Sequence, residues 1–122
     1  MYSRRKAIST KISSANSVLV THSGRPGTVS SAIAAADAVI ISTPEYNKAI
    51  SGSLKNALDW VSRTEGNPWK DKPLAIMSAA AGRAGGERSQ FSLRLAMMPF
   101  RTHILQGPEV LVGGSSNEFD EN

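Results

Sequence analysis

Apolar residues occur along the chain in short runs, separated by polar segments rich in glycine and proline. Residues 38–42 and 74–78 form nearly continuous apolar runs, as expected for strands that are covered on both faces. Residues 51–63 and 87–98 repeat apolar positions at the spacing of an α-helix. Leu54, Ala57, Leu58 and Val61 form the apolar stripe of the first helix, and Phe91, Leu95 and Met98 share one side of the second.

The remaining segments carry weaker patterns. Residues 17–22 are rich in β-branched side chains and predict a strand, and the alanine-rich residues 28–36 predict a short helix. Residues 102–105 and 109–112 predict two further strand segments, whereas 1–16 have no clean period and predict a poorly ordered tail with at most a short helix. The alternation of strands and helices predicts an α/β fold with a mostly parallel sheet and helices on both faces.

Two loops follow the predicted central strands, at 43–47 and 78–86. Parallel sheets of this kind bind ligands beyond the carboxyl ends of their strands, so we expect both loops to border one shallow site. The first loop contributes Pro44, Glu45, Tyr46 and Asn47. The site therefore lies where two loops meet at one edge of the sheet.

The composition of these loops suits a flat heterocycle with hydrogen-bonding edges. Gly82, Gly85 and Gly86 would let a planar ligand lie close to the main chain. Tyr46 would supply an aromatic wall, and Asn47 would supply a donor and an acceptor. The alternative interpretation is that Pro44 and these glycines only shape turns.

Other kinds of chemistry have little support. The chain contains no cysteine, which excludes disulfides and thiolate chemistry, and His22 and His103 have no metal-ligand spacing. No Ser-His-Asp arrangement or carboxylate pair can be assembled, so we expect no catalytic side chain and no metal. We expect instead that a cofactor carries the chemistry. No apolar run approaches the roughly 18 residues that cross a membrane, so no membrane partner is expected.

Charge divides the chain into two parts. The net charge of +4 equals the number of basic residues among the first eleven, and no acidic residue precedes Asp37. We therefore distinguish a basic, serine-rich segment at 1–27 from a balanced domain at 28–122. The segment has three interpretations: a transit peptide, an altered start, or a tail that binds phosphates weakly. Nucleic acid is not an expected partner of the domain.

Several spaced motifs resemble the NADPH-dependent FMN reductase family. Residues 36–47 resemble its strand-and-loop signature, and 52–60 resemble the helix that follows. Residues 71–86 resemble the next strand with its glycine loop, and Leu93-Arg94 and 108–110 fall where similar chains have them. The resemblance covers residues 31–120.

This resemblance implies a shortened flavodoxin-like fold, a three-layer sandwich around a mostly parallel sheet. It implies a cytoplasmic NAD(P)H-dependent reductase that passes a hydride to FMN and then to a small-molecule acceptor such as a quinone, flavin or azo compound. The first loop would hold the pyrimidine edge of the flavin through main-chain amides, and the second would flank the ring. The implied cofactor-binding residues are Pro44, Glu45, Tyr46, Asn47, Ser78, Gly82, Arg83, Gly85 and Gly86.

The resemblance also implies a homodimer or homotetramer through the helix at 52–63. Trp60 lies off the core stripe of this helix, which fits an anchor in an interface. The alternative is that Trp60 packs under the polar loop at 65–73. Exposed apolar sheet surface in so short a chain favours self-association or poor solubility.

The chain departs from the family at both ends. Similar chains begin with a strand and a phosphate loop of the form Gly-Ser-x-Arg-x-x-Ser-x-Asn, which residues 1–27 do not resemble, and they end with a further helix. One substitute is the strand, glycine loop and helix start at 18–28, with Arg25 nearby. Two other functions stay open: a non-catalytic remnant that keeps only the oligomer scaffold, and a basic-tailed binding module.

Overall fold

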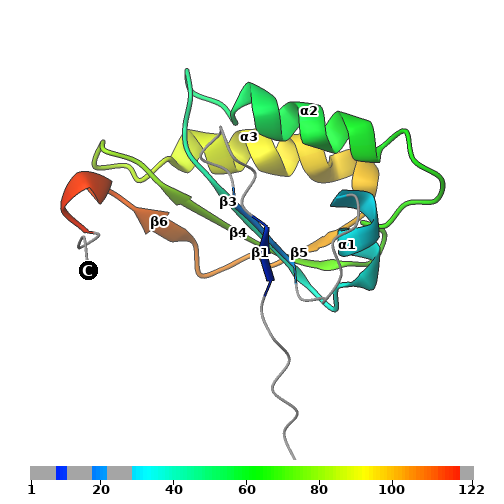
Figure 1. The fold of residues 1–122 in the computed structure, drawn as a ribbon. Coiled ribbons are helices and arrows are strands. Elements are labelled where there is room, and N and C mark those ends of the chain that lie inside the picture. Colours follow the sequence, from blue (N-terminus) through cyan, green and yellow to red (C-terminus); the bar gives the residue numbers. More distant parts are fainter. Residues whose placement is uncertain (1–7, 11–17, 22–28, 119–122) are drawn as a thin grey trace, which may run out of the picture.

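The computed structural model describes residues 8–10, 18–21 and 29–118 (Figure 1). Helices and strands alternate through most of this part of the chain, as the sequence predicts. The strands are β1 (Ile8–Thr10), β2 (Val18–Thr21), β3 (Val39–Thr43), β4 (Pro73–Ala79), β5 (His103–Ile104) and β6 (Val110–Val112). The helices are α1 (Val29–Ala35), α2 (Gly52–Val61) and α3 (Glu87–Met97), with short 3-10 turns η1 (Met98–Phe100) and η2 (Ser115–Asn117).

The strands form one sheet with the order β1-β2-β3-β4-β5, and β6 pairs with the far half of β4. β3, β4, β5 and β6 run parallel to one another. Leu74 of β4 pairs with Ile104, and Met77 pairs with Val110, so β5 and β6 follow the same edge of β4 one after the other. The mostly parallel sheet is therefore confirmed.

The N-terminal strands differ from expectation. β2 lies beside β3, but it is antiparallel to it, with Val18 opposite Ser42 and Thr21 opposite Val39. β2 therefore ends at the sheet edge opposite the carboxyl end of β3. Residues 22–28, which hold most of the predicted substitute phosphate loop at 18–28, lie outside the described residues. The prediction of a poorly ordered tail was wrong for residues 8–10, because they pair with β2 and form a strand. A strand of three residues is too short to show a recognisable pattern in the sequence.

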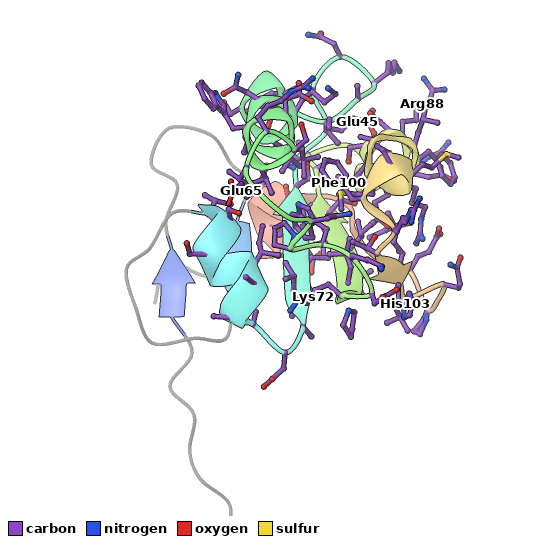
Figure 2. The ribbon with its side chains drawn as sticks, turned by 90° about the vertical axis from the view of Figure 1, so that its right-hand side faces the viewer. Glu45, Glu65, Lys72, Arg88, Phe100 and His103 are labelled. Carbon is purple, nitrogen blue, oxygen red and sulfur yellow. The ribbon has the colours of Figure 1, made fainter. Side chains whose placement is uncertain are left out.

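The described helices build one core on one face of the sheet. Side chains alternate between buried and half-buried along β3 and β4, and Ile41 and Ile76 point into the core. α2 and α3 lie on the same side of the sheet in both views (Figures 1 and 2). Val29 of α1 shares a small apolar cavity with Ile41 and with α2. The described part of the chain thus shows two layers, a sheet and a helical layer.

The ends of two helices are fixed by side chains. The Ser51 hydroxyl accepts a hydrogen bond of 3.2 Å from the Leu54 amide, which satisfies one of the unpaired donors at the start of α2. The Lys72 ammonium donates to the carbonyl of Ala36, just beyond the end of α1, where a positive charge is favourable. No described helix is long and apolar enough to span a membrane.

The two tryptophans occupy opposite environments. Trp69 is 1% exposed and meets Phe100 edge-on, with ring centroids 6.2 Å apart. Trp60 is 71% exposed, so the interpretation that it packs under the following loop was wrong. It points away from the core stripe of α2, whose Leu54, Leu58 and Val61 are buried as predicted.

The apolar side of α3 faces solvent. Phe91, Leu95 and Met98 are all exposed, whereas the polar residues Ser89 and Gln90 are buried. Leu93 and Met97 supply the apolar part of the buried side. Amphipathic pattern alone assigns the apolar side of a helix to the core. The inverted arrangement leaves one apolar surface exposed and places two polar side chains against the sheet.

Candidate functional site

Three neighbouring parallel strands end in one row. Thr43 of β3 pairs with Ser78 of β4, and Ser78 pairs with Leu111 of β6. The loops that follow, at 44–50, 80–86 and 113–114, therefore leave the sheet at the same edge. The structure brings together the two loops that the sequence predicts and adds a third, after β6, that was not predicted to border the site.

The first loop contains a tight turn with an unusual backbone. The Tyr46 amide donates to the Ala49 carbonyl at 2.9 Å, and the Ala49 amide donates to the Tyr46 carbonyl at 3.0 Å. Asn47 and Lys48 between them have φ values of 50° and 69°. Positive φ at both central residues is the geometry of a type I′ turn, which favours Asn and Gly and costs energy at Lys. Strain of this kind concentrates at functional sites.

This turn leaves main-chain donors unpaired. The N–H groups of Glu45, Asn47 and Lys48 have no hydrogen-bond partner within the described part of the chain. They lie just beyond β3, next to the carboxyl end of β4. Donors that are exposed and held by a tight turn are suited to a ligand edge that carries acceptor oxygens.

The Glu45 side chain ties the first loop to α3. One of its carboxylate oxygens accepts a hydrogen bond of 3.1 Å from the Arg88 amide in the first turn of that helix (both residues are labelled in Figure 2). Gly86 occupies the N-cap position and has no side chain to do this. Glu45 therefore caps the helix from 43 residues away in sequence, and its charge is favourable at the positive end of the helix dipole.

The glycines of the second loop serve different purposes. A Cβ atom on Gly85 would lie 2.9 Å from the main chain of Leu111 and Val112, and one on Gly86 would lie 3.0 Å from the Cβ of Ser78. Both have positive φ. Their small size is thus required by the packing of the chain on itself. Gly82 is exposed and open, and it alone of the three leaves room for a ligand to approach the main chain.

The second loop also presents unpaired amides. The Ser115 amide donates a hydrogen bond to the Ala80 carbonyl, and the Gly114 amide donates one to the Gly82 carbonyl. These bonds attach the second loop to the segment that follows β6. The amides of residues 81–84 have no partner among the described residues. Together with the first loop, they form a surface of main-chain donors. No group of three or more metal-ligating side chains occurs in the described ranges.

Several residues that hold the site were not predicted from the sequence. Ser92 on α3 accepts a hydrogen bond of 3.4 Å from the Ile50 amide. Gln90, also on α3, donates to Ser78 and to the Val110 carbonyl. A polar residue in a helix predicts exposure, so Gln90 and Ser92 gave no signal. The Gly113-Gly114 pair did give a turn signal, and a Cβ on Gly113 would collide with the Arg83 carbonyl.

Comparison with known proteins identifies the relationship. The family model for NADPH-dependent FMN reductases matches residues 9–117. The chain belongs to this family. The match takes in residues 9–27, which the sequence motifs alone do not connect to the family, and the domain boundary after residue 27 stays a prediction.

Individual relatives of this chain also support its membership of the FMN reductase family. An NAD(P)H-dependent FMN reductase of Pseudomonas aeruginosa is 47% identical over 88 residues, which make up 72% of this chain and 48% of the relative. A quinone reductase of Escherichia coli is 39% identical over 100 residues, 80% of this chain and 53% of the relative. The chain thus spans about half the length of the relatives that it matches.

A solved structure supports the fold. The flavoenzyme NAD(P)H:(acceptor) oxidoreductase from Paracoccus denitrificans superimposes with a TM-score of 0.63 at 36% identity, over 67% of this chain and 46% of that one. The flavodoxin-like α/β class is therefore confirmed.

The different roles of the glycines predict different tolerance to substitution. We expect Gly85→Ala to lower the free energy of unfolding by about 1–3 kcal/mol, because it combines positive φ with contact against the backbone of β6. Gly82→Ala is the matched control, with an expected change within about 0.5 kcal/mol. Urea denaturation of both variants measures this difference. Equal effects would show that the second loop does not pack on β6 as described.

Proposed function

We propose that this chain binds the isoalloxazine ring of FMN at the edge formed by the three loops and acts as an NAD(P)H-dependent reductase. The observation that carries the proposal is a surface of main-chain amides at 45, 47, 48 and 81–84 that have no partner within the described ranges, held by a strained turn and a glycine loop. Membership of the FMN reductase family supports it independently.

The residues present fit the ring of FMN. The pyrimidine edge carries two carbonyl oxygens, which would accept hydrogen bonds from the amides of the type I′ turn. Tyr46 is partly exposed beside these amides and would contact the ring or its entry path. Pro44, Glu45, Tyr46 and Asn47 would thus hold one edge, while Gly82 would leave space for the ring beside the second loop. The second loop would be shaped or bordered by Ser78, Arg83, Gly85 and Gly86.

FMN bound at this edge would supply the chemistry of hydride transfer between NAD(P)H and a small-molecule acceptor. The chain binds and orients the reactants, and its amides polarise the flavin edge. The loops offer no side chain arranged as a general base, in keeping with a reaction that needs none from the protein. The name of the Escherichia coli relative supports a quinone as acceptor.

A second candidate function is a remnant that keeps the scaffold without catalysis. The observation in its favour concerns the phosphate of FMN. In the described ranges, the strand beside β3 on the outer side is the antiparallel β2, which ends at Thr21 opposite Val39, at the sheet edge away from the amide surface. The amide surface thus supports binding of the flavin ring, whereas β2 adds no support for a site that binds the phosphate.

Titration with FMN separates the two functions. We expect quenching of flavin fluorescence on addition of the purified protein, followed by bleaching near ~450 nm when NADPH is added anaerobically. Bleaching that is reversed by a quinone would support the reductase. Absence of quenching at high concentrations of FMN and protein would contradict it and favour the remnant.

We further propose that the chain self-associates through α2 and α3, as a homodimer or homotetramer. Trp60 on α2 and Phe91, Leu95 and Met98 on α3 are each more than half exposed. A groove of about 460 Å³ runs between these helices, and Lys55 and Asp59 form a 2.7 Å ion pair at its border. Large exposed apolar side chains of this kind mark interfaces more often than free surfaces.

A charge placed on this surface should disrupt the assembly. We expect light scattering to give two or four times the chain mass of 13.0 kDa for the unaltered protein, and a smaller mass for Leu95→Lys. Leu105→Lys is the matched control, since Leu105 is also exposed but lies beyond β5. A monomeric unaltered protein, or equal dissociation by both substitutions, would contradict an interface at α2 and α3.

A further inference from the structure

Gln90 is a buried polar residue in the helical layer. It is 1% exposed and lies in the first half of α3. Its side-chain amide nitrogen donates hydrogen bonds of 2.9 Å to the Ser78 hydroxyl and 2.9 Å to the Val110 carbonyl. One side chain thus joins α3 to the carboxyl end of β4 and to the start of β6.

The contact continues into the glycine loop. The Ser78 hydroxyl, which accepts from Gln90, donates its own proton to the Gly85 carbonyl at 2.6 Å. Ser78 and Gly85 are both buried. Since a hydroxyl has a single proton, the donation from Gln90 leaves Ser78 oriented toward Gly85. The peptide plane between Gly85 and Gly86, where the loop turns into α3, is fixed by this relay.

This arrangement is not what stability alone would favour. The side-chain oxygen of Gln90 has no hydrogen-bond partner among the described residues, and a buried polar atom without a partner lowers stability. An apolar side chain of similar length would avoid this cost. What the glutamine supplies instead is two donors of fixed direction, which an apolar side chain lacks.

We infer that Gln90 is a positioning residue that sets the geometry of the loop at 80–86 through Ser78 and anchors β6 beside it. Residues 81–84 form the exposed part of this loop, and Gly85, whose carbonyl accepts from Ser78, forms its buried end. The effect on FMN rests on the proposed function, whereas the effect on the loop does not.

The test removes both donors while keeping the length of the side chain. In Gln90→Met, hydrogen exchange of the paired loop amides of Ala80 and Gly85, which donate to the carbonyls of Val112 and Gly82, should accelerate by about tenfold or more. FMN affinity should fall by about tenfold, as expected for loss of an oriented hydrogen bond. Gln106→Met is the matched control, because Gln106 also donates to one main-chain carbonyl, but from an exposed position after β5. It should leave both quantities unchanged.

A second variant distinguishes positioning from general destabilisation. Ser78→Ala breaks the same relay and leaves Gln90 its bond to Val110, so it should accelerate exchange in the same loop. In the double variant, the changes in exchange and affinity should be smaller than the sum of the single changes. If Gln90→Met does not fold, exchange in Ser78→Ala decides alone. Unchanged loop exchange, or strictly additive effects, would overturn the inference. Absence of FMN binding in the unaltered protein would contradict the proposed function only, since exchange still tests the loop.

Discussion

The parallel pairing of β3, β4 and β6 is the constraint on which the site depends. Because Thr43, Ser78 and Leu111 share one row, the loops that follow them leave the sheet side by side. Parallel strands leave their carboxyl ends at one edge, and helices that return from this edge begin next to it. The starts of α2 and α3 therefore supply the second support of the site, through Ser51, Glu45 and Gln90.

The main chain carries the binding surface, and side chains carry its geometry. The unpaired amides need no particular residue to present them, but the turn at Asn47 and Lys48 needs positive φ, and Gly85 and Gly113 need the absence of a side chain. Ser92 and Gln90 hold the loops from α3, and Glu45 ties the first loop to the start of that helix. Such a division suits a cofactor that performs the chemistry itself, where the protein contributes orientation and polarisation.

Local patterns predicted the elements of the domain well. The continuous apolar runs identified β3 and β4, and the helical spacing of Leu54, Leu58 and Val61 identified both α2 and its buried side. The direction of β2 could not be predicted from such patterns. Apolar content indicates that a strand is buried, but it does not distinguish a parallel strand from an antiparallel one. The buried side of α3 was also beyond them. There, the requirement to hold loops with Ser89 and Gln90 outweighs the placement of Phe91 and Leu95 in the core.

The claim that main-chain amides at this edge form the ligand surface is tested most directly by amide chemical shifts. Titration of ¹⁵N-labelled protein with FMN should shift the amide signals of Glu45, Asn47, Lys48 and residues 81–84, because hydrogen bonding and the ring current of the flavin act on these groups. The amides of residues 62–67, beside the groove between α2 and α3, should keep their positions. Shifts confined to that groove, or no shift at saturating FMN, would contradict the account.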